Sequence, residues 1–217
     1  MHYRAQGLTI RTENAAKSIG QVSKSLVSWI VANVSVNAAL DYGCGHLRYA
    51  HVLSRASNRL GLVDSPEQLD RRCCIGGNVT TVRALAKRTW PSCRLYTVAE
   101  FWNGVSERYD FVICANVLSA IPSRAIRSRS LAAIRTCLHR SGRFLVVNQH
   151  TNSYFTAAMA SPLASKHLDG WILRSSIGPS YFGILNRDKV IRILRSHQFR
   201  ILESWIEGQS NYVLAGK

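Results

Sequence analysis

The chain has 217 residues, of which 47% are hydrophobic and 18% are charged. This is the composition of a folded globular protein, and it excludes a disordered or fibrous chain. The longest apolar runs, such as residues 144–147, are too short to cross a bilayer, and residues 1–14 lack the apolar segment of a secretory signal. We therefore expect a cytoplasmic protein with no membrane association, folded as one domain over residues 1–217.

The chain is strongly basic, with 28 Lys and Arg residues against 12 Asp and Glu residues and a net charge of +16. Such a field attracts polyanions, so the charge favours nucleic acid, RNA included, as a partner class. An arginine-rich composition can also result from codon bias, so the charge alone does not decide whether the protein binds nucleic acid. The six cysteines include no CxxC pair, and no histidine pair has the spacing of zinc ligands, which predicts reduced cysteines and no metal site.

The order of apolar runs predicts the architecture. Residues 1–36 predict a helical segment with an amphipathic helix over 15–34, because the apolar positions from Ile19 to Ile30 fall on one side of it. Strand-length apolar runs then alternate with helical stretches, which is typical of a parallel sheet with crossover helices. The predicted strands are residues 38–41, 60–64, 94–98, 111–115 and 143–148. The predicted helices are residues 46–54, one from Ser65-Pro66 to a break near residues 76–78, residues 83–88 and 123–138, and one from Asn186.

The C-terminal part departs from this alternation. Residues 151–182 carry aromatics, prolines and glycines without a sustained period, and we expect them to form a cap or insertion over the site. Residues 201–205 and 212–215 are two apolar runs joined by a short turn. They predict an antiparallel hairpin at one edge of the sheet.

Three features fall at the carboxyl ends of predicted strands, where open α/β sheets bind ligands. Gly43 and Gly45 follow the first strand, where glycine lets the backbone turn and approach a ligand closely. Asp64 ends the second strand, where a carboxylate can accept hydrogen bonds from two ribose hydroxyls. Glu100 follows the third strand and can accept from an adenine amino group. Each feature is weak alone, but their order indicates an adenosine-containing cofactor.

Four segments of the chain resemble motifs of one enzyme family. Residues 39–45, Ala-Leu-Asp-Tyr-Gly-Cys-Gly, resemble the first motif of class I S-adenosylmethionine-dependent methyltransferases, an acid followed by GxGxG. Residues 60–64 resemble the second motif, 110–118 the fourth-strand motif and 138–147 the helix-to-strand-five segment. The match spans about half of the chain. It implies a Rossmann-like, doubly wound, seven-stranded sheet, mostly parallel with an antiparallel C-terminal hairpin, and S-adenosyl-L-methionine as the cofactor.

The resemblance also implies a set of cofactor-binding residues. The glycine loop would line the methionine end, the acids after the second and third strands would hold the ribose and, together with Phe101, the adenine, and Asn116 with Val117 would lie beneath the sulfonium. The implied set is Asp41, Gly43, Cys44, Gly45, Asp64, Ser65, Glu100, Phe101, Asn116 and Val117.

One residue of the loop departs from the family pattern. The third glycine of the motif is Leu47, which is expected to take up room near the cofactor and to alter the shape of the site. A nicotinamide cofactor is the rival interpretation. Its fingerprint requires GxGxxG, whereas Gly45 is followed by His46, Leu47 and Arg48.

Methyl transfer is an in-line displacement that depends mainly on holding the nucleophile near the methyl carbon. His150, after the fifth strand, is the candidate general base because histidine titrates near neutrality, and Asn116 is the second catalytic candidate. Enzymes that methylate base amino groups carry Asn or Asp, two prolines and an aromatic after the fourth strand. The sequence at 116–119 is Asn-Val-Leu-Ser, which disfavours that reaction.

Three hypotheses on function remain. The first is an enzyme that methylates a small molecule or metabolite. The second is an RNA- or DNA-directed methyltransferase, which is favoured by charge. For this hypothesis, the basic residues Arg124, Arg127 and Arg129, and those at 187, 189, 192 and 195, would track a phosphate backbone if they cluster around the mouth of the site. The third is a catalytically silent methyltransferase-like binding subunit, which Leu47 keeps open.

Overall fold

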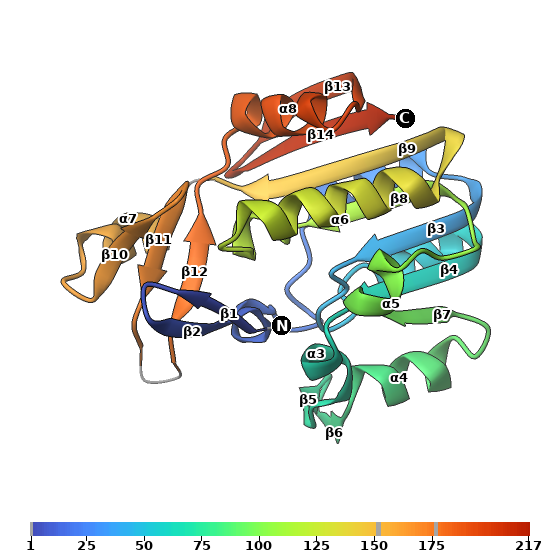
Figure 1. Ribbon diagram of the computed structural model, residues 1–217. Coiled ribbons are helices and arrows are strands. Elements are labelled where there is room, and N and C mark those ends of the chain that lie inside the picture. The colour runs from blue at the N-terminus through green and yellow to red at the C-terminus, as the bar shows by residue number, and fades with distance from the viewer. Residues whose placement is uncertain (1, 151–152, 176–177) are drawn as a thin grey trace.

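The computed structural model describes residues 2–150, 153–175 and 178–217 (Figure 1). Seven strands form its central sheet: β3 (Val36–Tyr42), β4 (Ser57–Asp64), β7 (Arg94–Thr97), β8 (Tyr109–Ala115), β9 (Leu138–Gln149), β13 (Arg200–Glu207) and β14 (Ser210–Gly216). Their order is β13-β14-β9-β8-β3-β4-β7, with β14 antiparallel to both neighbours and all other pairs parallel. The predicted Rossmann-like α/β sheet, with its antiparallel C-terminal hairpin, is therefore confirmed.

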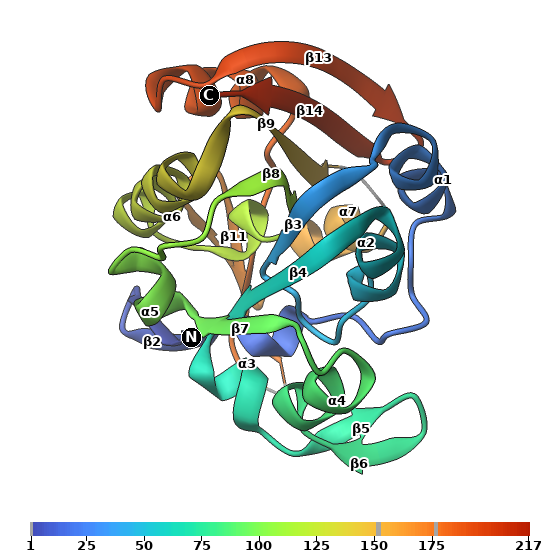
Figure 2. The same cartoon turned by 90° about the vertical axis from the view of Figure 1, so that its right-hand side faces the viewer.

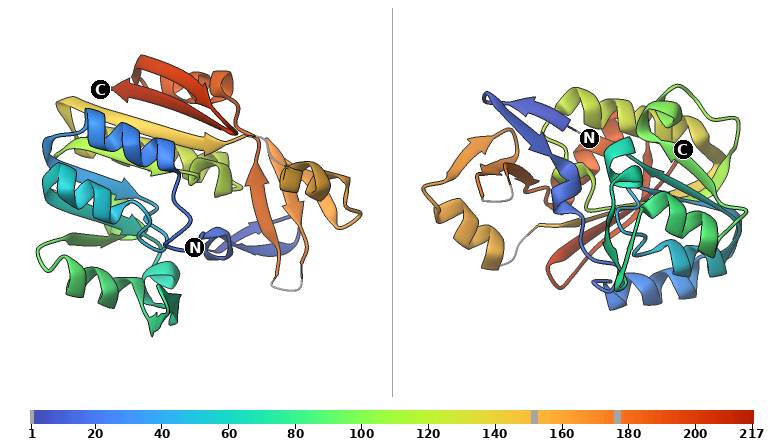
Figure 3. Two further views of the ribbon diagram at one scale, coloured as in Figure 1. Left: turned by 180° about the vertical axis from the view of Figure 1, so that it is seen from behind. Right: turned by 90° about the horizontal axis from the view of Figure 1, so that it is seen from below.

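Helices cover both faces of this sheet (Figures 2 and 3). On one face lie α1 (Lys24–Asn33), α2 (Ala50–Ala56) and α4 (Val82–Thr89), and on the other α5 (Val98–Trp102), α6 (Arg124–Cys137) and α8 (Arg187–Ser196). Apolar side chains three or four positions apart, such as Leu131 and Ile134 on α6, are fully buried against the strands. The central strands are apolar on both faces because both are covered.

Side-chain caps set where several helices begin. The Ser123 hydroxyl accepts from the Ile126 amide at the start of α6, and the Asn186 side chain accepts from the Lys189 amide at the start of α8. Ser65 caps the short helix α3 (Pro66–Asp70), as its Ser-Pro sequence predicts. These positions are readable from the sequence because a cap is a local interaction.

The helix predicted to run from Ser65 to the glycines at 76–78 is wrong beyond Asp70. The chain instead forms a hairpin of β5 (Cys73–Ile75) and β6 (Asn78–Thr80). Gly76 and Gly77 have φ values of +58° and +83°, so both adopt the left-handed conformation that a two-residue hairpin turn requires. The glycines therefore reverse a hairpin and do not break a helix.

The N-terminal segment is also different from the predicted helical segment over 1–36. It begins with a hairpin of β1 (His2–Ala5) and β2 (Leu8–Arg11), followed by the 3-10 helix η1 (Thr12–Ala15). The helix predicted over 15–34 starts only at Lys24, after the cap Ser23. Only the second half of the apolar pattern over residues 15–34 corresponds to a buried helix face. Leu26 and Ile30 are buried there, whereas Val22 is 39% exposed.

Residues 153–183 form a second small unit. It contains α7 (Ser153–Ala160) and an antiparallel sheet of β10 (Ala164–His167), β11 (Gly170–Leu173) and β12 (Ser180–Gly183). Ile10 of the N-terminal hairpin is buried in one cluster with Ile172 and Tyr181 of this sheet. Both lie beyond the carboxyl ends of the central strands (Figure 1).

Candidate functional site

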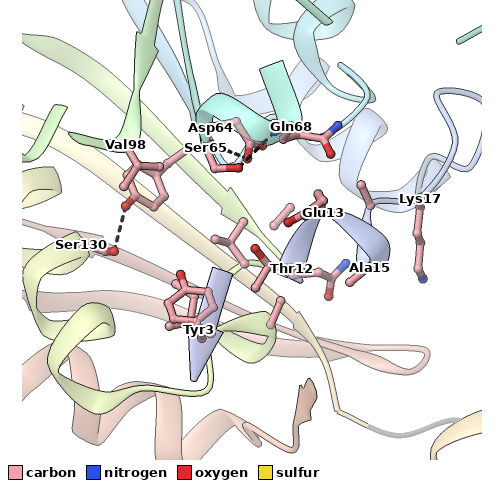
Figure 4. Close-up of a pocket in the computed structure, with 18 of the residues that line it drawn as sticks. Tyr3, Thr12, Glu13, Ala15, Lys17, Asp64, Ser65, Gln68, Val98 and Ser130 are labelled. Atoms are coloured by element: carbon pink, nitrogen blue, oxygen red, sulfur yellow. Dashed lines mark hydrogen bonds between the residues drawn. The ribbon is translucent and has the colours of Figure 1, made fainter. Parts of the chain in front are cut away.

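A cavity lies at the carboxyl ends of β3, β4 and β8, the edge at which the sequence places its candidate residues (Figure 4). Gly43, Asp64, Ser65, Asn116 and Val117, five of the ten predicted cofactor residues, line it together. The other five do not line it. The cavity measures about 120 Å³. Sites for small molecules usually measure roughly 300–1,000 Å³, so this one is narrow.

Gly43 is fixed by the sheet and by a close neighbour. Its amide donates to the Val63 carbonyl at 2.8 Å, and its φ is +80°. A Cβ atom at this position would lie 2.2 Å from Val117 Cγ2. Only glycine satisfies both constraints, because an L side chain rarely adopts this φ and has no space here. The glycine therefore brings the loop against the segment after β8.

Leu47 occupies the position of the missing third glycine in an unexpected way. Its φ is +65°, so the leucine backbone adopts the conformation that favours glycine. Its side chain is 1% exposed and packs in the core, and it does not line the cavity. The Leu47 side chain therefore takes up no space in this cavity, and its effect on cofactor binding stays a prediction. The helix predicted from His46 begins only at Ala50, because the turn at 44–47 precedes it.

Asp64 is held by two backbone amides. Its Oδ2 accepts from the Gly45 amide at 2.8 Å and its Oδ1 from the Ser65 amide at 2.7 Å. Burial raises the pKa of this carboxyl, and the two hydrogen bonds oppose the shift. Gln68 donates to the Gly45 carbonyl at 3.0 Å and closes the arrangement. The glycine loop and the acid after β4 are thus one hydrogen-bonded unit, and Asp64 faces the cavity in a fixed position.

Asp41 and Cys44 lie in the protein interior. Asp41 is 2% exposed, and its Oδ2 has no hydrogen-bond partner in the part of the chain that the structure describes. Burial raises the pKa of Asp41 to about 7, with Arg48 opposing and Asp64 adding to the shift. Cys44 packs in the core, and burial raises the pKa of its thiol. Burying a carboxylate oxygen without a hydrogen-bond partner costs free energy, so the interior destabilises the ionised form of Asp41.

Asn116 joins β8 to β9 at the floor of the cavity. Its amide donates to the Val147 carbonyl and its side-chain oxygen accepts from the Gln149 amide, both at 2.8 Å. Its φ is +62°, in the left-handed region that asparagine adopts more readily than most other residues except glycine. The Asn116 side chain is therefore a positioned part of the wall, and its oxygen is engaged by the backbone.

The structure does not bring Glu100 or Phe101 to the cavity. Glu100 is exposed, and its carboxylate accepts from the Thr97 amide and hydroxyl in a capping box. These hydrogen bonds hold the pKa of Glu100 below its usual value. Phe101 is 1% exposed in the core. Val98 and Trp102, one helical turn apart on the same short helix, line the cavity instead.

His150 also does not line the cavity. Its backbone amide donates to the Gln209 carbonyl at 3.0 Å, next to the end of β9. Its Nδ1 is buried without a hydrogen-bond partner among the described residues. The residues that follow, 151–152, lie outside the described part of the chain. His150 therefore does not face the cavity as a general base would.

The N-terminal segment forms a wall of the cavity that the sequence does not predict. Tyr3, Thr12, Glu13 and Lys17 line the cavity together with the residues of the strand ends (Figure 4). Glu13 is 7% exposed, its carboxylate contacts His2 Nε2 at 2.9 Å, and its carbonyl accepts from Arg71. Burial acts to raise the pKa of Glu13, but its hydrogen bonds hold the pKa below the usual value. None of the described residues of 153–182, the predicted cap, lines this cavity.

Other predicted absences concern metals, membranes and disulfides. Among residues 2–150, 153–175 and 178–217, no group of three His, Cys, Asp or Glu side chains is placed to hold a metal ion. Within the same residues, no helix is long and apolar enough to cross a membrane. All six cysteines are described, and all carry free thiols.

Comparison with known proteins identifies the family. No family model matches the chain. YmfD of Escherichia coli (strain K12), an uncharacterized protein, is 36% identical over all 217 residues, which cover 96% of YmfD. The chain is a YmfD-family protein with the class I S-adenosylmethionine-dependent methyltransferase fold. The similarity extends over the whole of this chain and is not confined to one motif.

Solved structures carry the fold assignment for this YmfD-family chain. A S-adenosylmethionine-dependent methyltransferase from Clostridium acetobutylicum matches with a TM-score of 0.62 and 14% identity, over 94% of this chain and 93% of that one. The PH0226 protein from Pyrococcus horikoshii matches with a TM-score of 0.68 and 13% identity, over 93% of this chain and 94% of that one. The 1,6-didemethyltoxoflavin-N1-methyltransferase from Burkholderia thailandensis matches with a TM-score of 0.61 and 17% identity, over 89% of this chain and 77% of that one. At these identities the likeness shows the fold.

Proposed function

We propose that this protein is an S-adenosylmethionine-dependent methyltransferase that acts on a small molecule. The observation that carries the proposal is the meeting of Gly43, Asp64 and Asn116 in one cavity at adjacent strand ends. Similar structures support it, because the Burkholderia thailandensis enzyme holds S-adenosylhomocysteine together with its small-molecule substrate. The turn of Leu47 into the core removes the main reason for a catalytically silent protein.

The residues of the cavity fit the chemistry of the cofactor. Asp64 would accept hydrogen bonds from ribose hydroxyls, since each carboxylate oxygen has a lone pair beyond the one used by a backbone amide. Val98 and Trp102 would hold the adenine, in place of the predicted Glu100 and Phe101.

The chain's own residues would mainly position the acceptor. When bound, S-adenosylmethionine supplies an electrophilic methyl carbon on a sulfonium. Tyr3 and Glu13 line the cavity from the N-terminal segment, so they would contact the acceptor. The lowered pKa of Glu13 keeps it ionised at neutral pH, and its carboxylate would accept a hydrogen bond from an amine or hydroxyl of the acceptor. Alignment of that group with the methyl carbon would supply most of the rate.

Calorimetry with S-adenosylhomocysteine tests the cofactor site. We expect the wild type to bind and Asp64→Ala to bind roughly 10–100-fold more weakly, since hydrogen bonds to a charged group contribute about 1.5–3 kcal/mol. Asp70→Ala is the matched control, because Asp70 is exposed and pairs only with Arg83 among the described residues. Equal affinities for the two variants, or no binding by the wild type, would refute the proposed site.

The acceptor class is tested by transfer of a labelled methyl group into a cell extract. The extract is divided into small molecules, RNA and protein before the reaction. We expect label in the small-molecule fraction, and none there with Gly43→Val. Label confined to RNA or protein would overturn the small-molecule assignment while leaving the cofactor site intact.

A further inference from the structure

A second hollow lies away from the cavity, between α6 and α8. The two helices lie on the same face of the central sheet (Figures 1 and 2). The hollow between them measures about 400 Å³ and shares no lining residue with the cavity. We call it the α6–α8 groove. The residues used below are Arg124, Arg127, Asp169, Lys189 and Arg192, all of which line it.

The floor of the α6–α8 groove is a fixed ionic network. The guanidinium of Arg127, a residue only 3% exposed, donates to the Ile121 carbonyl at 2.9 Å, to the Tyr181 hydroxyl at 3.0 Å and to Asp169. Lys189 Nζ lies 3.1 Å from the other oxygen of Asp169. The one carboxylate in the groove is therefore already paired with two cations, which hold its pKa below the usual value despite partial burial.

The rims of the groove carry two further cations. Arg124 lies in the first turn of α6 and Arg192 lies on α8, and both side chains are exposed. Neither has a hydrogen bond or an ion pair in the described chain. Four cationic side chains thus line the groove against a single carboxylate. Two guanidinium groups that face one hollow from opposite helices suit an oxyanion, because each can form two parallel hydrogen bonds to it.

The other basic residues that the sequence singled out do not join this cluster. Arg129 lies over the Trp102 ring at 4.7 Å from its centroid, and Arg187 pairs with Asp188 on its own helix. Neither lines the groove. The cluster therefore lies in a hollow separate from the cavity, so these basic residues do not surround the mouth of the cavity.

We propose that the α6–α8 groove binds a phosphate oxyanion through Arg124 and Arg192. The phosphate belongs either to the backbone of RNA or to a phosphorylated small molecule, and the same two side chains serve both. The net charge of +16 would raise the local concentration of either ligand. The proposal is independent of methyl transfer, since the groove and the cavity have no residue in common.

The test compares two double variants that remove the same charge. The rim variant, Arg124→Ala with Arg192→Ala, removes both exposed arginines of the groove. The control variant, Arg55→Ala with Arg59→Ala, removes two exposed arginines from α2 and β4 on another part of the surface. One arm measures fluorescence anisotropy of a labelled single-stranded oligouridylate over a salt series. The other arm measures calorimetric binding of adenosine monophosphate and of inorganic phosphate.

If RNA is the source, the rim variant loses about tenfold or more in RNA affinity, and the slope of log affinity against log salt falls by about 1.4 for the two lost contacts, whereas the control variant stays near the wild type. If a phosphorylated small molecule is the source, the rim variant loses binding of adenosine monophosphate or phosphate and the RNA arm does not separate the variants. Equal behaviour of the two double variants in both arms, or no binding by the wild type in either, would overturn the proposal.

Discussion

The two walls of the cavity are built in different ways. The strand-end wall, with Gly43, Asp64 and Asn116, is held by backbone hydrogen bonds of the central sheet. The N-terminal wall, with Tyr3 and Glu13, rests on a short hairpin whose apolar contacts are made with a second, small sheet. A fixed wall suits the recognition of an invariant cofactor. A wall attached through a few side chains can shift, so we expect the cavity of about 120 Å³ to widen when a cofactor binds.

The largest expected effect is at the strand-end wall. Gly43→Ala places a methyl group 2.2 Å from Val117 Cγ2 at a φ of +80°. We expect cofactor affinity, measured by calorimetry, to fall by about 100-fold or more. Gly77→Ala is the control, because Gly77 has a φ of +83° and nothing within 4 Å of its added Cβ. A loss of affinity that both variants share would mean that strain alone, and not the contact with Val117, is responsible.

Leu47→Gly separates stability from binding within the same wall. Glycine adopts the φ of +65° freely, but the change removes a side chain that is 1% exposed in the core. We expect the free energy of unfolding, measured with urea, to fall by about 2–4 kcal/mol. The affinity for S-adenosylhomocysteine should stay within about twofold. A clearly tighter complex would show that Leu47 does crowd the cofactor.

Arg71→Ala addresses the N-terminal wall. Arg71 donates to the Glu13 carbonyl at 2.8 Å and so ties the N-terminal segment to the end of α3. Its loss should speed amide hydrogen exchange over residues 8–17 by about 10-fold, since one such bond contributes about 1.5 kcal/mol. Arg72→Ala is the neighbouring control, because Arg72 is exposed. Unchanged exchange in Arg71→Ala would show that the wall is held by its apolar cluster alone.

A further prediction concerns the pH dependence of stability at Asp41. Burial raises the pKa of Asp41 to about 7, far above its ordinary value of 3.8. Between these values the folded state binds more protons than the unfolded state, so the free energy of unfolding from this group falls as pH rises through 4 to 7. Melting temperatures of the wild type minus those of Asp41→Asn should therefore decline over that range. A flat difference would mean that Asp41 is not desolvated.

The sheet could be predicted from the sequence because its signals are local. Each central strand is a short apolar run, and caps such as Ser65, Ser123 and Asn186 are read from neighbouring residues. The strand-end wall follows for the same reason, since parallel strands bring their carboxyl ends together.

The N-terminal wall could not be predicted because its contacts are distant in sequence. Ile10 is buried against Ile172 and Tyr181, more than 150 residues further along the chain, and neither segment alone has a long periodic pattern. Glu100 was misplaced for another reason. An acid three residues after Thr97 also completes a capping box, and the structure uses it in that role.

A crystal structure of the protein with S-adenosylhomocysteine tests the central claim most directly. We expect the ligand between Gly43 and Asn116, with its ribose hydroxyls on Asp64 and its adenine beside Val98 and Trp102. We also expect the N-terminal wall to be displaced from its present position, which leaves only about 120 Å³. Ligand bound elsewhere, or a ribose away from Asp64, would contradict this account.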